Sequence, residues 1–147
     1  MRIGDLLRRS VVAVRPDQTI AEAASIMNSA GVGALAVVDD DRLVGIVTDR
    51  DLVRRGLARA LGSDAPVESV MTTGVITVDA DDDAHQLYSV LRSHALRRLP
   101  VMRDGKLVGM ISVDDLIIHL AADLSDLARP ITGEVLFAQR DMVPGTV

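Results

Sequence analysis

The chain has 147 residues, of which 48% are hydrophobic, and a formal net charge of −5. One Tyr, one Phe and no Trp argue against a stacked-aromatic platform for single-stranded nucleic acid. Basic residues scattered among acids disfavour binding to DNA or to an anionic membrane. Because cysteine is absent, disulfides, thiolate metal sites and a Cys nucleophile are excluded. The charged N-terminus and the lack of a long apolar stretch predict a cytoplasmic protein.

The chain repeats itself at an offset of 64 residues, which aligns Val11–Val14 with Val75–Val78 and Asp41–Leu52 with Gly105–Leu116. The register holds without a gap over 56 residue pairs, and 14 of these pairs are identical. Such a match at one ungapped offset indicates a duplicated unit. We therefore expect a first unit at residues 1–60, a second at residues 66–123, and a partly mobile tail at residues 124–147.

Each unit predicts the same order of elements: an amphipathic segment, a β-branched run, a helix, two short strands and a closing helix. In the first unit these fall at Ile3–Leu7, Val11–Val14, a helix with a Thr19/Glu22 capping box, Ala34–Val38, Leu43–Val47, and a helix from Thr48. In the second they fall at Val67–Met71, Val75–Val78, a helix capped by Asp81 or Asp82, Leu99–Met102, Leu107–Ile111, and a helix from Ser112. The predicted fold class is α/β (α+β), with duplicated β-α-β-β-α units.

A single unit of this size would bury little apolar surface. We therefore expect the two units to pack about a pseudo-twofold axis and to share one core.

A Gly-h-x-[Thr/Ser]-x-x-Asp segment, in which h is apolar, closes each unit as Gly45–Asp51 and Gly109–Asp115. With the order of elements, it resembles the cystathionine-β-synthase (CBS) domain, which occurs in tandem pairs called Bateman modules. Leu96–Val101 is similar to the stretch that supplies basic groups to nucleotide phosphates in the γ subunit of AMP-activated protein kinase. The resemblance covers about residues 1–122. It implies a regulatory module that binds AMP, ADP, ATP or S-adenosylmethionine, requires no cofactor, and acts as a homodimer or on a separate effector protein.

The residues themselves suit such a ligand. One carboxylate, Asp51 or Asp115, can accept hydrogen bonds from two neighbouring ribose hydroxyls. A phosphate suits the helix starts at Thr48 and Ser112, although Ser or Thr followed three residues later by an acid also caps a helix. The Arg97–Arg98 pair can grip a phosphate bidentately, or can form a solvated strand end.

The family resemblance implies that each cleft combines residues of both units. The first cleft would be lined by Thr48, Asp51, Thr77, Val78, Arg97, Arg98 and Pro100. The second would be lined by Ala13, Val14, Gly33, Ala36, Ser112 and Asp115. Because Gly33 and Ala34 occupy the positions that match the arginine pair, we expect strong phosphate affinity in the first cleft only. The second would be weaker, unoccupied, or suited to a less charged ligand.

No nucleophile–base set and no metal motif is visible, so we expect a protein that is not an enzyme. His85, His94 and His119 share no motif, and the acids from Asp79 to Asp83 fit a helix start better than a cation loop. The alternative function is a dimerisation or partner-docking module with no physiological nucleotide. In the tail, Pro130 is expected to stop any helix, Val135–Phe137 to dock on the module or on a dimer mate, and the last ten residues to be mobile.

Overall fold

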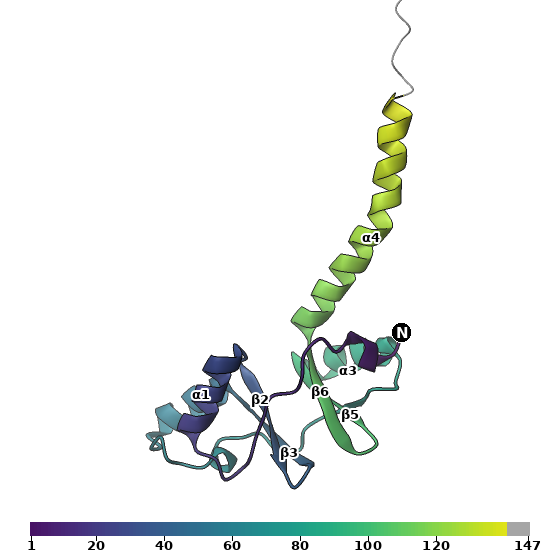
Figure 1. The fold of residues 1–147 in the computed structure, drawn as a ribbon. Helices are drawn as coiled ribbons and strands as arrows, with labels where there is room; N and C mark the ends of the chain where they lie inside the picture. Colours follow the sequence, from purple (N-terminus) through teal and green to yellow (C-terminus); the bar gives the residue numbers. More distant parts are fainter. Residues whose placement is uncertain (141–147) are drawn as a thin grey trace, which may run out of the picture.

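The computed structural model describes residues 1–140, and for residues 132–140 it describes the backbone alone. Two three-stranded sheets, one from each repeat, form the body of the molecule (Figure 1). The strands of the first sheet are β1 (Ala13–Val14), β2 (Ala34–Asp39) and β3 (Arg42–Thr48). Those of the second are β4 (Val78–Asp79), β5 (Arg98–Arg103) and β6 (Lys106–Ser112). The expected duplicated, mixed α/β fold is confirmed.

The two sheets match each other in strand order and in register. In each, the first strand runs parallel to the second, and the second pairs antiparallel with the third. Val14 lies opposite Val37, and 64 residues later Val78 lies opposite Val101. A register shift follows Val37 in one sheet and Val101 in the other. The duplication seen in the sequence is therefore also a duplication of hydrogen-bond pattern.

The first helix of the first repeat, α1 (Ile20–Ala30), begins at the expected capping box. The backbone N–H of Glu22 donates to Thr19 Oγ1 over 3.1 Å, and the N–H of Thr19 donates to Glu22 Oε2 over 3.0 Å. The helix ends at Gly31, whose φ of 64° lies in the left-handed region that glycine adopts without strain. Ala23 and Met27 form its buried face.

The equivalent helix of the second repeat is α3 (Ala84–His94), and its N-cap is Asp83. The expectation that Asp81 or Asp82 caps it is wrong. Asp81 lies in the preceding turn, where its backbone N–H donates to the carboxylate of Asp79 over 2.9 Å. Asp83 is the acid directly before the first helical residue, and its Oδ1 accepts the backbone N–H of His85 over 2.8 Å.

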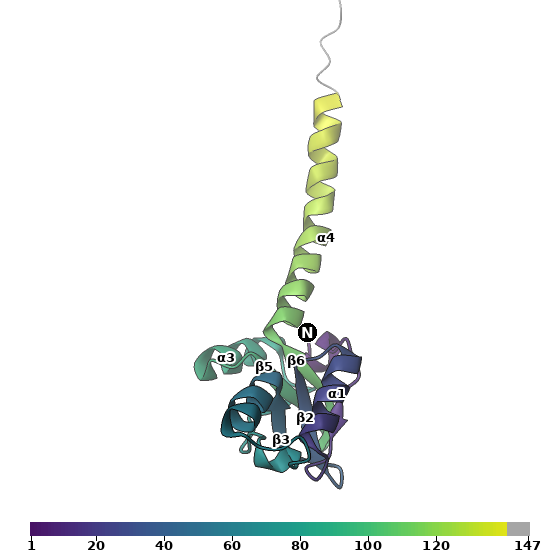
Figure 2. The same cartoon turned by 90° about the vertical axis from the view of Figure 1, so that its left-hand side faces the viewer.

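The closing helices of the two repeats differ greatly in length. α2 (Asp49–Asp51) continues into a π-helical turn, η2 (Leu52–Gly56), and a 3-10 turn, η3 (Leu57–Arg59). Its counterpart α4 (Val113–Arg140) is a helix of 28 residues that projects from the body (Figures 1 and 2). The expectation that Pro130 stops any helix is wrong, because this proline lies inside α4. A proline removes one backbone donor, and a long helix keeps the hydrogen bonds on either side.

Two further predictions for the tail stay predictions. Val135–Phe137 belongs to the helical backbone of α4, but its side chains, and hence its docking, lie outside the described residues. The predicted mobility of the last ten residues falls mostly on residues 141–147, which also lie outside them. Among residues 1–140, no helix combines the length and the apolar content needed to cross a membrane.

The short helices that open the two repeats are exchanged between them. η1 (Ile3–Leu6) lies against the second repeat, where the N–H of Gly4 donates to the carbonyl of Ala80 over 2.8 Å. η4 (Val67–Ser69) lies against the first, where the N–H of Val67 donates to the carbonyl of Gln18 over 2.8 Å. Each repeat is therefore completed by a helix from the other.

This exchange corrects the expectation of one shared core. The structure has two apolar clusters, and each combines one repeat with the opening helix of the other. Ile3 and Leu6 are buried in the cluster of the second repeat, whereas Val67 and Val70 are buried in the cluster of the first. Neither repeat can bury its own apolar face without the other, so the pair folds as one body.

The glycine of the repeated motif makes room for the segment that follows each exchanged helix. A Cβ on Gly45 would lie 2.8 Å from the carbonyl oxygen of Thr72, which accepts the N–H of Ile46 over 3.0 Å. A Cβ on Gly109 would lie 2.6 Å from Cδ2 of Leu7. At Gly45 the obstacle is backbone, so only glycine lets the chain approach so closely there. At Gly109 the obstacle is the end of the Leu7 side chain, which can rotate away, so the exchange accounts for Gly45 more strictly than for Gly109.

Candidate functional site

The two closing helices begin with the same reciprocal pair of a hydroxyl and a carboxylate. In α2, the N–H of Thr48 donates to Asp51 Oδ2 over 3.0 Å, and the N–H of Asp51 donates to Thr48 Oγ1 over 3.1 Å. In α4, the corresponding distances for Ser112 and Asp115 are both 3.1 Å. The Ser112 hydroxyl also donates to Asp115 Oδ2 over 2.7 Å. Both pairs are part-buried, so each helix start holds its carboxylate in a fixed orientation.

One cavity, here called the first pocket, is lined by residues of both repeats and has a volume of about 580 Å³. Thr48 and Asp51 line it from the first repeat, and Arg97 and Arg98 line it from the second. Its remaining lining residues are Ile46, Asp49, Arg50, Thr72, Gly74, Val75, Ile76, Leu96 and Asp114. The structure thus brings together four of the seven residues named for the first cleft.

The other three residues named for that cleft do not line this cavity. Val78 is 6% exposed and belongs to the core, and the side chain of Pro100 is fully buried in β5. Thr77 lines a separate cavity of about 340 Å³, together with Arg42 and Gly74. Val75 and Ile76, which precede Val78 in the sequence, line the first pocket. The Val78 side chain is instead packed in the core of the second repeat.

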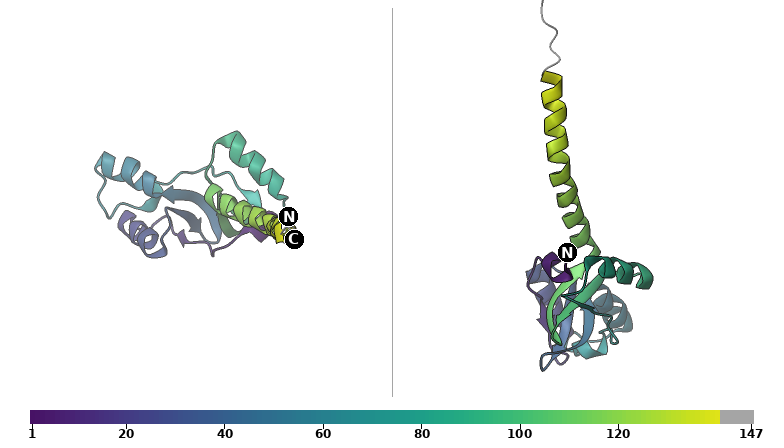
Figure 3. Two further views of the ribbon diagram at one scale, coloured as in Figure 1. Left: turned by 90° about the horizontal axis from the view of Figure 1, so that it is seen from above. Right: turned by 90° about the vertical axis from the view of Figure 1, so that its right-hand side faces the viewer.

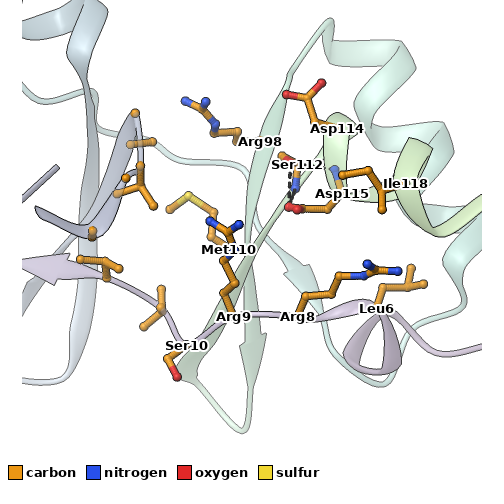
Figure 4. Close-up of a pocket in the computed structure, with 17 residues that line it drawn as sticks. Leu6, Arg8, Arg9, Ser10, Arg98, Met110, Ser112, Asp114, Asp115 and Ile118 are labelled. Atoms are coloured by element: carbon orange, nitrogen blue, oxygen red, sulfur yellow. Dashed lines mark hydrogen bonds between the residues drawn. The ribbon is translucent and has the colours of Figure 1, made fainter. Parts of the chain in front are cut away.

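A second pocket, of about 360 Å³, lies at the start of α4. Three of the six residues named for the second cleft line it: Gly33, Ser112 and Asp115. Ser112 and Asp115 are labelled in Figure 4. Ala13, Val14 and Ala36 are not among its lining residues. Val14 and Ala36 are buried in the first sheet, and Ala13 is exposed elsewhere on β1.

Sequence reasoning missed the arginines of the second pocket. Arg8 and Arg9, on the segment that follows η1, line it, and so does Arg98 from β5 (Figure 4). At the repeat offset of 64 residues, Arg8 matches Thr72, which lines the first pocket. The signal was therefore present in the sequence, but it becomes meaningful only when the exchange of the opening segments is known.

Arg98 lines both pockets, and it does so from a position where the first repeat has Ala34. It reaches back towards the first repeat, because a Cβ on Gly33 would lie 3.5 Å from Arg98 Nη2 and 3.0 Å from Asp49 Oδ2. Within residues 1–131, the guanidinium groups of Arg8, Arg9, Arg97 and Arg98 form no ion pair with a carboxylate. These four cations are therefore available to an anionic ligand.

The pockets contain groups that suit a nucleotide better than a metal ion. Within the described part of the chain, no group of three or more His, Asp or Glu side chains converges as cation ligands would. His119 lies on α4, and its Nε2 is 3.4 Å from Asp123 Oδ2 without the geometry of a hydrogen bond. The arrangement offers carboxylates for hydroxyl groups, arginines for phosphates and helix starts for anions.

A family model and a curated relative both match this chain over most of its length. The family model of the CBS domain matches residues 3–58 and again residues 67–122. The CBS domain-containing protein YhcV of Bacillus subtilis is 34% identical over 117 residues, which cover 80% of this chain and 84% of YhcV.

Two solved structures among the matches contain adenosine compounds. A CBS domain protein from Pyrobaculum aerophilum, complexed with AMP, matches with a TM-score of 0.73 and 30% identity, over 83% of this chain and 99% of that one. A CBS domain pair in complex with 5′-methylthioadenosine and S-adenosyl-L-methionine matches with a TM-score of 0.74 and 25% identity, over 84% of this chain and 98% of that one.

Proposed function

The chain belongs to the CBS-domain family, with two CBS domains in tandem, and from this premise we propose that it is a regulatory module that binds adenine nucleotides. AMP, ADP or ATP would bind in the first pocket, between the repeats. The module would bind the nucleotide without catalysing a reaction on it. Bound nucleotide would act on a separate partner protein, or through a dimer of the chain, by favouring the arrangement of the repeats to which it binds more tightly.

The observation that carries the proposal is the meeting of Thr48 and Asp51 with Arg97 and Arg98 around one cavity. The Asp51 carboxylate would accept hydrogen bonds from the ribose hydroxyls, and the two guanidinium groups would bind phosphate. The volume of about 580 Å³ lies within the usual range for small-molecule sites. Apolar side chains such as Ile46 and Ile76 would contact the adenine ring.

The ligands of related structures support the choice of an adenosine compound. AMP was bound by the Pyrobaculum aerophilum protein, and S-adenosyl-L-methionine and 5′-methylthioadenosine by the other CBS domain pair. The positive charge at Arg97 and Arg98 favours a phosphate-bearing ligand over the two sulfur compounds in the first pocket.

The second pocket is proposed to bind a phosphate-bearing ligand as well. The sequence led us to expect a weaker or less charged site there, because Gly33 and Ala34 replace the arginine pair. Arg8, Arg9 and Arg98 nevertheless line this pocket, and Ser112 and Asp115 lie at its helix start. Its smaller volume, about 360 Å³ against about 580 Å³, favours a smaller nucleotide than the first pocket binds.

Isothermal titration calorimetry on the full chain tests the proposal. The ligands would be AMP, ATP, adenosine and S-adenosylmethionine, and the proteins would be the wild type and the double variant Arg97→Ala/Arg98→Ala. We expect saturable binding of AMP or ATP, and a loss in the double variant that is at least tenfold larger for ATP than for adenosine. Arg92→Ala, an exposed arginine on α3 outside both pockets, is the matched control and should bind as the wild type does.

Absence of saturable heat, with no rise in melting temperature at high ligand concentration, would contradict the nucleotide proposal. That result would favour the second candidate, a dimerisation or docking module. A docking module is supported by the large apolar side chains that are exposed on the closing helices: Val53, Leu57, Ile117, Ile118, Leu120, Leu124, Leu127 and Ile131.

A further inference from the structure

The outer part of α4 carries a stripe of exposed apolar side chains. Ile117 is 58% exposed, Leu120 49%, Leu124 68%, Leu127 70% and Ile131 63%. Every residue from 121 to 131 is exposed, and none of the five stripe side chains is buried against the body. Figures 1 and 2 and the right-hand view of Figure 3 show the helix leaving the body with no other helix or strand beside its outer part. The stripe is therefore unpartnered within one chain.

The spacing of these five residues is that of a coiled coil. The intervals from Ile117 to Ile131 are three, four, three and four residues, which is the alternation of positions a and d in a heptad repeat. Ile117, Leu124 and Ile131 occupy position a, and Leu120 and Leu127 occupy position d. A stripe that merely covers a globular core is broader than this narrow seam.

A helix with an exposed apolar stripe lacks the main source of helix stability. In proteins, most of that stability comes from packing an apolar face against another surface rather than from helix propensity. α4 also contains Pro130, which removes a backbone donor and crowds the preceding turn. Since the helix begins on the body at Val113, its outer part needs a second surface along the seam to stay helical.

We propose that α4 pairs with α4 of a second copy of this chain, as a parallel two-stranded coiled coil in register. The seam is self-complementary, because each a or d side chain can insert between the a and d side chains of an identical helix. The combination of Ile at a with Leu at d favours two parallel strands, and four of the five seam positions follow it. Leu124 is the one exception at position a.

The residues beside the seam agree with this arrangement. Ala121 and Ala128 occupy position e, where small side chains let two backbones approach closely, and Arg129 lies on the outer face at position f. Asp123 occupies position g. In an antiparallel pair centred on Leu124, the two copies of Asp123 would face each other, and such like charges repel. In a parallel pair, Asp123 faces position e of the partner helix, which is uncharged.

The pairing does not depend on nucleotide binding, and it can be tested on the full chain alone. Analytical ultracentrifugation should give a dimer for the wild type. Leu124→Glu/Leu127→Glu places two charges in the seam and should shift the dimer dissociation constant by at least a hundredfold. Both side chains are exposed in one chain, so the body should keep its melting transition. Ala122→Glu/Ser125→Glu adds the same charge on the outer face, at positions f and b, and should remain a dimer.

The absence of native cysteine allows the direction to be tested separately. Leu127→Cys should form a disulfide-linked dimer on mild oxidation, because identical d positions adjoin in a parallel pair. Ser125→Cys, on the outer face, should not. A wild-type chain that is monomeric at every concentration, or a seam variant that dimerises as the wild type does, would overturn the proposal. A dimer that Leu124→Glu/Leu127→Glu dissociates but that Leu127→Cys fails to link would overturn the parallel arrangement.

Discussion

Thr48 and Asp51 bind each other in both directions: each donates its backbone N–H to the side-chain oxygen of the other, over 3.0 and 3.1 Å. The carboxylate proposed to bind ribose is therefore also the acid of a capping box. Its second oxygen, Oδ1, lies 3.8 Å from Nε of Arg55 on the next turn. The repeated Thr/Ser-x-x-Asp segment can therefore cap a helix and bind ribose at the same time. Substitutions are needed to separate its effect on stability from its effect on ligand binding.

Replacing Asp51 by Ala should lower both stability and ribose binding. The backbone N–H of Thr48 would lose its hydrogen-bond partner, which costs about 1 kcal/mol of unfolding free energy, whereas Thr48 Oγ1 would still accept the N–H of residue 51. Asp51→Asn keeps a side-chain oxygen for the N–H of Thr48, so it should cost less stability. It should still weaken AMP, because a neutral amide makes weaker hydrogen bonds to the ribose hydroxyls than a carboxylate does. Urea unfolding measures the first effect and calorimetry the second.

The matching substitution in the second repeat separates the two pockets. Asp115→Ala removes the equivalent hydrogen bond from the N–H of Ser112, so its stability loss should be similar to that of Asp51→Ala. We expect Asp51→Ala to weaken the tighter nucleotide site more than Asp115→Ala does. The opposite order would mean that the two pockets are assigned the wrong way round.

Arg98 should affect two binding sites at once, because it lines both pockets. Arg98→Ala should weaken nucleotide binding in each pocket by about tenfold, the usual scale for one charge-assisted hydrogen bond. Arg97→Ala should weaken only the first, and Arg8→Ala only the second. Calorimetric titrations with ATP, fitted to two sites, compare the three variants. If Arg98→Ala weakened binding at one site only, Arg98 would not contribute to both pockets.

Ile3 should be needed for the stability of the second repeat, although it belongs to the first. Its side chain is fully buried in the cluster that contains Leu87, Leu99 and Ile111. Ile3→Ala should therefore cost about 2–4 kcal/mol of unfolding free energy. Urea unfolding followed by the fluorescence of Tyr88, which packs against this cluster, measures the change. Met1→Ala, at a residue 60% exposed, is the control and should change little.

The sequence predicted the duplicated fold because the repeat keeps both its register and its apolar pattern. Short strands such as Leu43–Val47 and Leu107–Ile111 appeared within one or two residues of their observed bounds, β3 and β6. The capping box at Thr19 was found because its signal is local. Local signals also placed Thr48 and Ser112 at helix starts.

What the sequence did not predict depends on contacts between distant segments. The exchange of η1 and η4 follows from packing, and no residue in Ile3–Leu6 indicates which repeat it joins. Arg8 and Arg9 were overlooked for the same reason, since only the exchange brings them to Ser112. Pro130 was read from its local preference alone, which the length of α4 overrides.

Asp83 should make the protein more sensitive to acid. The backbone N–H of His85, and then its side chain, hydrogen-bond to this carboxylate and lower its pKa below the ordinary value of 3.8. A lowered pKa in the folded state means that folding favours the ionised carboxylate. This contribution to stability is fully present above pH 3.8 and is lost as the pH falls through the lower, folded-state pKa.

Asp83→Asn isolates the charge, because asparagine also caps helices well and can still accept the N–H of His85. The stability difference between wild type and Asp83→Asn should be constant at neutral pH and should shrink as the pH falls below 3.8. Urea unfolding at a series of pH values measures this difference. Asp104→Asn, in the exposed turn between β5 and β6, should give a difference that changes less over the same range. If the stability difference between wild type and Asp83→Asn grew on acidification, the folded state would bind the Asp83 proton more tightly than the unfolded state does. That result would contradict a lowered pKa for Asp83.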